Sequence, residues 1–492
     1  MSTAGAMSLR LRGICAGHSF ASHVLAVSGS AFVAQALSVL VGPINSRLYH
    51  PADYGTLSLF GAMFTSVSVV STMQYEMSLA TADDDTEGMH LLLLCLALVA
   101  AWSVLIALAT FGLPRQVAHL LSRDDTQFLK YLWFLPYGIA ATALCQTFQR
   151  WAMRMQAFPM LSLVQVIQGI LASACTVTLG FMHAGLPGLI AGSMVSSLFG
   201  IYAFGRLAYP RFRALRGRLS LAGLRAAALR YYRYPLYTTW STLLSTFSGL
   251  VPVLLLTRGF GNVYTGYFSL CQRILFLPIL LVSGAITPVF YSRARQAQKD
   301  GTLASLTTRL VESITGVNVF FSVFLALFGE WVLVLVFGPQ WRRAGQYAVA
   351  LAPWVLCTFL VNPLEALALV YDRQRTSFVF QIVLLALRTA SLLAGIHFRN
   401  DLLAMGLFGG TSAVYMLVYF AWLLRLVDGP VAQTLGRLGK ELALALALLG
   451  ACRWLMEASH HNRWITAAAL VPVLCFFTYR STRQLLLGRA QV

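Results

Sequence analysis

Residues 90–113 read HLLLLCLALVAAWSVLIALATFGL, a stretch without a single Asp, Glu, Lys or Arg. An α-helix of about 20 apolar residues crosses a bilayer core about 30 Å thick. This stretch is therefore long enough to span a membrane. Similar stretches recur along the whole 492-residue chain, in which 58% of residues are hydrophobic and only 11% are charged. Because a soluble domain carries about 25% charged residues, the composition predicts an integral membrane protein.

The apolar stretches predict fourteen membrane spans. Backbone polar groups in lipid must be satisfied within a helix or a closed barrel, and these stretches lack the ten-residue alternation of barrel strands. The sequence therefore predicts an all-α polytopic membrane protein with about 14 transmembrane helices. The predicted spans are 21–46, 55–79, 90–113, 130–148, 158–183, 187–206, 234–257, 266–290, 309–329, 346–371, 376–397, 402–424, 441–457 and 464–479.

The N-terminal segment and the cysteines exclude several classes of protein. The first twenty residues are too polar for a cleavable signal peptide, so the first helix is expected to be a retained anchor. Eight cysteines are scattered without a CxxC or Cys/His cluster, which argues against disulfide frameworks and zinc sites. We expect no metal and no cofactor.

The distribution of Lys and Arg predicts how the chain is oriented. With a cytoplasmic N-terminus, 24 of the 36 basic residues lie in the cytoplasmic loops and tails and 9 lie on the opposite side. This asymmetry agrees with the positive-inside rule, so both termini are predicted to be cytoplasmic. The net charge of +19 is thereby explained by topology and by anionic lipid headgroups. Nucleic-acid binding is not expected, because the chain has no soluble basic module.

An internal repeat divides the chain. Two motifs recur in register: Arg47-x7-Gly55-x2-Ser58 with Arg258-x7-Gly266-x2-Ser269, at an offset of 211, and Gly188-x3-Gly192 with Gly406-x3-Gly410, at an offset of 218. GxxxG motifs let membrane helices approach closely. Two parallel six-helix repeats, as in many transporters, are therefore predicted.

This repeat suggests four regions. Residues 1–206 form an N-terminal six-helix lobe, 207–233 a basic cytoplasmic linker, 234–426 a C-terminal six-helix lobe, and 427–492 two extra helices with a cytoplasmic tail.

Several stretches resemble the Wzx-type polysaccharide flippases, and the resemblance covers most of the chain up to about residue 425. The stretch 42–55, GPINSRLYHPADYG, is similar to the first outer loop of that family. Further resemblances are carried by Gln74-Tyr75-Glu76, by the glycine, aromatic, arginine and proline pattern of 266–278, by Asn362-Pro363, by Asp372-Arg373-Gln374 and by Leu387-Arg388.

The resemblance implies membership of the multidrug/oligosaccharidyl-lipid/polysaccharide exporter superfamily, whose fold has two six-helix lobes around a central cavity. It implies a transporter in the bacterial inner membrane, not an enzyme. The implied activity is flipping an undecaprenyl-diphosphate-linked oligosaccharide to the periplasmic leaflet by alternating access, for O-antigen of lipopolysaccharide, capsule or exopolysaccharide. Implied partners are this substrate, membrane lipids, a polymerase and a chain-length regulator, with the flippase itself a monomer. Wzx-type members commonly have twelve spans and lipid II flippases fourteen, so the subfamily stays open.

Three arginines fall inside predicted spans: Arg273, Arg388 and Arg453. An intramembrane charge is costly and suggests function by default, and a guanidinium binds phosphate oxygens in a bidentate manner. Arg273 and Arg388 are therefore predicted to contact the substrate diphosphate. The alternative for each is pairing with an acid or helix carbonyls, or snorkelling to the interface. Arg453 lies outside the repeat, and packing or snorkelling is favoured there.

Other polar residues extend the predicted site. Glu76 is predicted to face a cavity, and Glu365 is predicted to be a salt-bridge partner, for instance of Arg388, or a coupling group. Gln74, Tyr75 and Asn45 are candidates for hydrogen bonds to sugar hydroxyls, with ordinary interhelical hydrogen bonds as the alternative. Aromatic residues near span ends, Trp341 and Trp354 among them, are predicted to be interfacial belt residues.

Two other functions compete with the flippase. A multidrug antiporter of the same superfamily would export organic cations, but cationic substrates favour lumenal acids whereas the deepest charges here are arginines. A membrane enzyme such as a polymerase or ligase usually carries a sizeable outer loop, which this chain lacks. No GxxxxGK[ST] motif indicates an ATPase.

Overall fold

A computed structural model describes residues 20–79, 81–116, 129–458, 471–473 and 475–477. Within these residues the chain is helical and contains no strand, which confirms the all-α fold class. Each predicted span up to 441–457 coincides with helix. The N-terminal tail and most of the predicted span 464–479 lie outside the described residues, so the count of fourteen stays a prediction.

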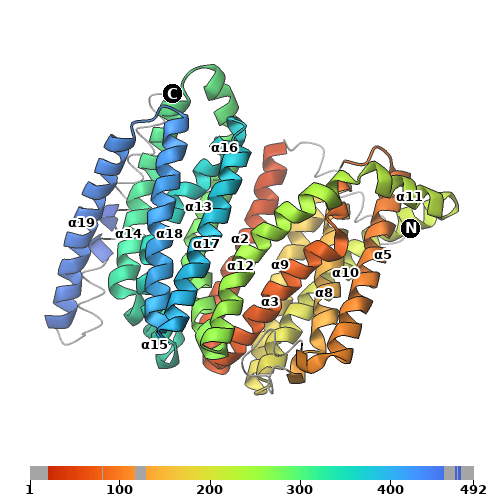
Figure 1. Ribbon diagram of the computed structural model, residues 1–492, viewed down its shortest axis with the longest axis horizontal. Helices are drawn as coiled ribbons and strands as arrows, with labels where there is room; N and C mark the ends of the chain where they lie inside the picture. Colours follow the sequence, from red (N-terminus) through yellow and green to blue (C-terminus); the bar gives the residue numbers. More distant parts are fainter. Residues whose placement is uncertain (1–19, 80, 117–128, 459–470, 474, 478–492) are drawn as a thin grey trace, which may run out of the picture. The chain divides into compact units, whose positions relative to one another are not determined.

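The helices have the following bounds: α2 Phe20–Leu48, α3 Pro51–Thr72, α4 Tyr75–Ser78, α5 Asp85–Gly112, α8 Phe134–Arg154, α9 Phe158–Phe181, α10 Leu186–Leu215, η2 Arg216–Arg218, α11 Leu221–Arg230, η3 Tyr234–Thr238, α12 Thr239–Gly259, α13 Asn262–Lys299, α14 Leu303–Phe337, η4 Pro339–Trp341, α15 Arg342–Val361, η5 Asn362–Glu365, α16 Ala366–Val370, α17 Gln374–His397, α18 Asp401–Leu426 and α19 Val431–Ala458 (Figure 1).

Nine helical segments of the described chain are long and apolar enough to cross a membrane. They are 51–72, 85–112, 158–181, 186–218, 234–259, 303–337, 339–370, 374–397 and 401–426. Each coincides with a predicted span.

The chain divides into two compact units, but the boundary differs from the predicted linker. Unit 1 contains the residues up to Leu48 and most of the chain from Phe60 to Phe247, and unit 2 contains 49–59 and everything from Ser248. The first turns of α3 thus belong to unit 2, and the main boundary falls within α12. The predicted linker 207–233 lies inside unit 1.

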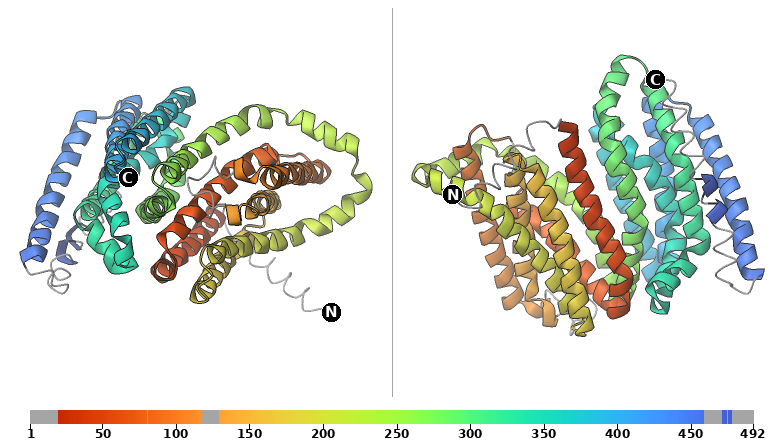
Figure 2. Two further views of the ribbon diagram at one scale, coloured as in Figure 1. Left: turned by 60° about the horizontal axis from the view of Figure 1, so that its bottom comes forward. Right: turned by 180° about the vertical axis from the view of Figure 1, so that it is seen from behind.

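In unit 1, α9 packs against α2 and α10, and α8 packs against α5 and α10. The short helix α11 lies against α5 at one end of these helices (Figure 1). The core at this end contains Leu91, Cys95 and the fully buried Trp151. In unit 2, α15 packs between α14 and α18, α17 packs on α18, and α19 lies along α14 (Figure 2).

The two copies of the 211-residue repeat meet each other in unit 2. A Cβ on Gly55 would lie 1.8 Å from the carbonyl oxygen of Asn262, and a Cβ on Gly266 would lie 1.8 Å from that of Pro51. The contact is reciprocal, since Asn262 and Gly266 stand 211 residues after Pro51 and Gly55. Only glycine permits so close an approach of two backbones. Gly55 and Gly266 are therefore packing positions of the first turns of α3 and α13.

The second repeated motif behaves differently in the two halves. A Cβ on Gly192 would lie 3.0 Å from the carbonyl oxygen of Ala172, so this glycine does allow a close helix contact. Gly406 and Gly410, in contrast, have open space at the Cβ position, and the expectation of close packing there is wrong. The neighbouring Gly409 approaches the carbonyl oxygen of Ala350 instead. Gly406 and Gly410 share one face of α18, because residues four apart in a helix lie above one another. Gly409 lies on a different face of α18, and that face contacts α15.

Three predicted spans are interrupted. The helix of α3 ends at Thr72, where Met73 and Gln74 take positive φ values of 48° and 58° before α4 begins. The span that begins at Pro339 contains a 3-10 segment over 362–365, where Pro363 lacks the N–H needed for an α-helical bond. A π-helical turn over 234–238 contains Pro235. Such interruptions are common at functional sites.

A charged cluster ties α15 to the start of α18. The Arg343 guanidinium donates from Nε to Asp401 Oδ2 at 2.8 Å and from Nη2 to Asp401 Oδ1 at 2.5 Å. The Tyr347 hydroxyl donates to the same carboxylate at 2.6 Å. Asp401 is 6% exposed, so its charge depends on these partners.

We expect Arg343→Gln to lower the free energy of unfolding by about 2–3 kcal/mol, because it leaves Asp401 buried without its cation. Thermal denaturation of the detergent-solubilised protein measures the loss. Arg342→Gln is the matched control: its pair with Glu330 is exposed and 3.5 Å long, so we expect a change within about 0.5 kcal/mol. Equal effects of both substitutions would contradict the role given to Arg343.

Candidate functional site

The break after α3 carries three of the predicted site residues, Gln74, Tyr75 and Glu76. All three side chains are buried in unit 1. The Gln74 amide donates to Glu76 Oε1 at 3.1 Å, and its carbonyl oxygen accepts a long bond of 3.5 Å from the Thr242 hydroxyl on α12. The Tyr75 hydroxyl donates to the Ala228 carbonyl of α11 at 3.1 Å.

Glu76 has an unsatisfied oxygen. Its Oε2 is buried and has no hydrogen-bond partner among the described residues, while the residue as a whole is 4% exposed. A buried carboxylate oxygen without a donor costs free energy. The polar break therefore offers one acceptor that a substrate hydroxyl or a proton can satisfy.

Asn45 lies elsewhere in unit 1. Its amide nitrogen donates to the Thr176 hydroxyl of α9 at 3.1 Å, which is the interhelical hydrogen bond weighed as the alternative for this residue. Its Oδ1 is buried without a partner among the described residues. The structure does not place Asn45 in hydrogen-bonding contact with Gln74 or Glu76.

Arg273 is exposed on α13, and its charge acts on the hydroxyl of Tyr54 near the glycine crossing of unit 2. Tyr54 itself packs edge-on against the buried Trp341 at a centroid distance of 5.2 Å. Tyr54 directly precedes Gly55 on α3, and Arg273 follows Gly266 by seven residues on α13.

Arg388 lies inside unit 2 in an aromatic cage. Its guanidinium carbon is 4.9 Å from the Trp354 ring and 5.2 Å from the Phe408 ring, and its Nε donates to Ser412 Oγ at 3.2 Å. Among the described residues, no carboxylate oxygen lies within 4.0 Å of this guanidinium. Cation–π contacts stabilise a desolvated cation but leave its charge unneutralised. Arg388 therefore retains a charge with which to attract an anion.

Trp354 is a residue whose role the sequence alone did not indicate. It is 2% exposed, so its predicted place in an interfacial belt is wrong, and the same holds for the fully buried Trp341. The position of a tryptophan near the end of a span predicts an interfacial belt residue. The sequence around Trp354 does not indicate that Arg388, 34 residues later, lies over its ring.

Glu365 lies in the 3-10 interruption η5, and its side chain is exposed. In the described part of the chain it forms no ion pair within 4.0 Å, with Arg388 or with any other cation. Its charge acts on Tyr419, whose hydroxyl is 2.9 Å from Ser377 Oγ.

Arg453 has local partners on α19 and α14. Its Nε donates to Glu457 one turn later at 2.8 Å, and its Nη1 donates to the Leu327 carbonyl at 2.9 Å. These are the acid and helix-carbonyl contacts expected of an arginine that supports packing.

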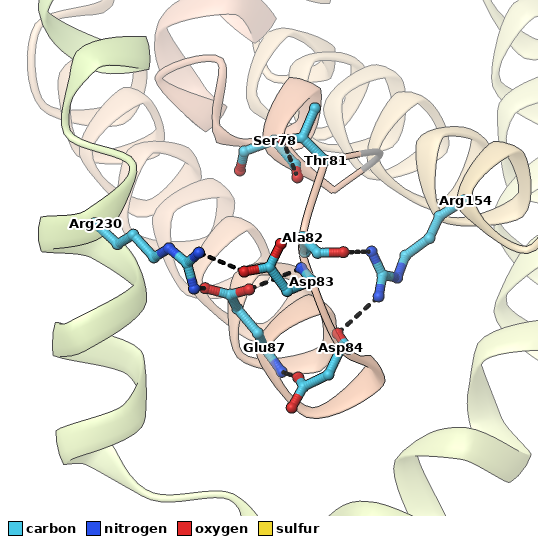
Figure 3. Close-up of polar contacts among 8 residues, drawn as sticks. All are labelled: Ser78, Thr81, Ala82, Asp83, Asp84, Glu87, Arg154 and Arg230. Carbon is cyan, nitrogen blue, oxygen red and sulfur yellow. Dashed lines mark hydrogen bonds and ion pairs between the residues drawn. The ribbon is translucent and has the colours of Figure 1, made fainter.

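The acidic run 83–87, which covers the end of the loop before α5 and the first turn of α5, forms a clamp that sequence reasoning missed (Figure 3). Asp83 and Glu87 both pair with Arg230 of α11, and Asp85 pairs with Arg211 of α10. The hydrogen bond and the negative charge of Asp83 raise the pKa of Arg230, so the arginine stays charged. The available signal was the run of four acids in 83–87, which faces an arginine-rich segment without acids at 207–233.

Arg154 supports the same loop from α8. Its guanidinium donates to the carbonyl oxygens of Ala82 and Asp84, each at 2.7 Å (Figure 3). It also donates to the carbonyl oxygen of Leu79 at 3.0 Å. Only 10% of its side chain is exposed. One fork thus satisfies three carbonyls of the turn that leads from α4 to α5.

We expect Arg154→Lys to destabilise the protein by about 2 kcal/mol, because an ammonium cannot serve three carbonyls in the plane of a guanidinium. The melting temperature in detergent measures the effect. Arg150→Lys, one turn earlier on α8, is the control, since its hydrogen bond is a weak one to Met153 Sδ at 3.7 Å. An unchanged melting temperature for Arg154→Lys would contradict the bracing role.

The described residues contain no group of three His, Cys, Asp or Glu side chains that could hold a metal ion. Cys95, Cys145, Cys175, Cys271 and Cys357 are free thiols.

Comparison with known structures relates the fold to membrane transporters. A structure of the lipid II flippase MurJ in an inward closed conformation superposes with a TM-score of 0.71 at 11% identity, covering 94% of this chain and 99% of MurJ. An inward-facing multidrug resistance MATE family transporter of the MOP superfamily superposes with a TM-score of 0.53 at 15% identity, covering 85% and 97%. At these identities the likeness concerns the fold. No curated protein sequence matches the chain.

A sequence profile of one protein family matches most of the chain. The family described as "Polysaccharide biosynthesis protein" matches residues 44–346, from the stretch before α3 to the start of α15. The matched region contains both copies of the glycine crossing and the polar break at Gln74. The apolar helices and the transporter fold make the chain a multi-pass membrane protein. Because the match spans more than half of its residues, the chain belongs to the polysaccharide biosynthesis protein family.

Proposed function

We propose that this protein is a flippase that moves an undecaprenyl-diphosphate-linked oligosaccharide from the cytoplasmic to the periplasmic leaflet of the bacterial inner membrane. The observation that carries the proposal is Arg388, a cation in the spanning helix α17 with no carboxylate within 4.0 Å among the described residues. A diphosphate is the anionic part of such a substrate, and a guanidinium binds its oxygens through two parallel hydrogen bonds.

Other residues are assigned to the sugar and to the transport cycle. The buried break at Gln74, Tyr75 and Glu76 supplies hydrogen-bonding groups for hydroxyls, and Glu76 Oε2 is an acceptor still open. Arg273, exposed on α13, adds a second cation for the diphosphate. Glu365 is a candidate for ion coupling, because it is a carboxylate in a spanning segment that forms no ion pair within the described chain.

The experiment uses the purified full chain in proteoliposomes with a fluorescent polyprenyl-diphosphate oligosaccharide. A membrane-impermeant reductant bleaches the label in the outer leaflet only, so flipping raises the bleached fraction above one half. We expect flipping faster than in empty vesicles, and slower flipping when unlabelled polyprenyl-diphosphate oligosaccharide competes. Flipping no faster than in empty vesicles would refute the proposal.

The same vesicles test the two alternatives. Uptake of an organic cation such as ethidium in response to a pH gradient would identify a multidrug antiporter. Elongation or transfer of the glycan, followed by mass spectrometry, would identify a polymerase or ligase. In cells, we expect deletion of the gene to remove the surface polysaccharide and to leave unpolymerised lipid-linked repeat units.

A further inference from the structure

The segment 207–233, which includes the last turns of α10 and all of α11, carries arginines of two kinds. Arg211 and Arg230 are paired with the acidic clamp of Asp83, Asp85 and Glu87. Five others are exposed and have no carboxylate oxygen within 4.0 Å among the described residues; they are Arg213, Arg216, Arg218, Arg225 and Arg233. The segment 207–233 contains no acid of its own. A concentrated positive surface is therefore left after the clamp has formed.

Helix α11 presents this surface in an amphipathic arrangement. One face is held on α5: Ala227 is buried, Gly223 contacts the His90 ring, and the Ser220 amide donates to His90 Nε2 at 3.3 Å. Positions spaced by four share one stripe of a helix, so Leu221, Arg225 and Leu229 lie together on the other face. The two leucines are 86% and 62% exposed.

The neighbouring helices indicate where this face lies. The spanning segment 186–218 ends just before α11, and the spanning segment 234–259 begins four residues after it. Tyr237 and Trp240, at the start of that second span, are 67% and 66% exposed, as is typical of aromatic residues at a membrane interface. Because α11 is joined so closely to both spans, we expect its exposed leucines at the level of the lipid headgroups.

We propose that α11 and the arginine-rich turn before it form an interfacial binding surface for anionic phospholipids. The leucines of the Leu221, Arg225 and Leu229 stripe enter the boundary between headgroups and acyl chains, as in amphipathic interfacial helices. The unpaired arginines bind the lipid phosphates through their guanidinium forks. The clamp holds α11 on α5 and thereby fixes the orientation of this face. Lipid binding at this face requires neither transport nor the glycan.

The test is a titration of the detergent-solubilised full chain with phosphatidylglycerol or phosphatidylcholine, with bound lipid counted by native mass spectrometry. We expect tighter binding of phosphatidylglycerol. The triple variant Arg216→Gln, Arg218→Gln, Arg225→Gln should bind it at least about tenfold more weakly, since each arginine near an anionic headgroup contributes about fivefold in affinity. Inorganic phosphate at matched concentration should not compete, because it lacks the acyl chains that contact the leucines.

A matched triple variant separates a site from a general effect of charge. Arg293→Gln, Arg295→Gln and Arg375→Gln remove the same charge from exposed arginines of other segments, and we expect less than a threefold change. The double variant Leu221→Ser, Leu229→Ser keeps every arginine, and it should also weaken binding. Both side chains project from the surface, so the melting temperature without lipid should stay unchanged. Equal losses in the two arginine triples, or competition by inorganic phosphate, would overturn the proposal.

Discussion

Gly55→Ala should destabilise the protein by on the order of 3 kcal/mol, a large effect for the addition of one methyl group. The new Cβ would lie 1.8 Å from the carbonyl oxygen of Asn262, whereas ordinary contacts are longer than 3 Å. Because the obstacle is backbone, no side chain can rotate away, and α3 and α13 must separate. Well-packed interiors resist such a shift. Melting of the purified protein in detergent measures the loss.

The repeat provides a second site and the helix provides a control. Gly266→Ala makes the reciprocal clash with the Pro51 carbonyl, so it should have an effect of the same size. Gly61→Ala lies on α3 with open space at its Cβ, and it should be neutral or stabilising by up to about 1 kcal/mol, because alanine favours a helix over glycine. If Gly55→Ala behaves like Gly61→Ala, the close crossing does not exist in the folded protein.

Arg388→Met should abolish surface polysaccharide while leaving the protein folded. Removing the guanidinium removes the cation assigned to the diphosphate, and methionine fills the space between Trp354 and Phe408 with a flexible apolar side chain. Replacing a buried charge by an apolar side chain of similar size is often neutral or stabilising. We therefore expect an unchanged or higher melting temperature together with at least a tenfold loss of polymer at normal protein level.

This pair of measurements separates a transport role from a structural one. If Arg388 served only to pack the cage, Arg388→Met would keep both stability and polymer. Arg388→Lys keeps the charge but loses the planar fork, so we expect intermediate activity. Arg373→Met, at an exposed helix junction, is the control and should leave polymer unchanged. Normal polymer in both Arg388→Met and Arg273→Ala would refute the proposed cationic binding site.

The helices were largely predictable because hydropathy is a local property. The predicted spans up to 441–457 each coincide with helix, and the repeated spacing in the sequence singles out Gly55 and Gly266, the two glycines of the crossing. The breaks within these helices were harder to predict from the sequence. Pro363 explains one of them, but Met73 and Gln74 adopt positive φ values that neither residue type signals. Tertiary packing imposes this turn and so brings Gln74 beside Glu76.

The candidate site is formed by contacts between residues that lie far apart in the sequence, and such contacts could not be predicted from the sequence. Gln74 accepts a hydrogen bond from Thr242, which is 168 residues away in the sequence. Asp83 pairs with Arg230, which is 147 residues away. The intramembrane position of Arg388 follows from the sequence, but its aromatic cage and its lack of a nearby carboxylate do not. For Asn45, the sequence left two partners open, and the structure places it on Thr176.

The sequence by itself determined that this chain is a helical membrane protein with a repeated architecture, because the cost of burying charge in lipid acts on each segment separately. Only the tertiary structure decided which arginines are neutralised and which remain available. Arg230 and Arg388 are equally charged in the sequence, yet one lies against two carboxylates and the other between two aromatic rings. That difference arises from the packing of distant helices, which residue type and local hydropathy do not encode.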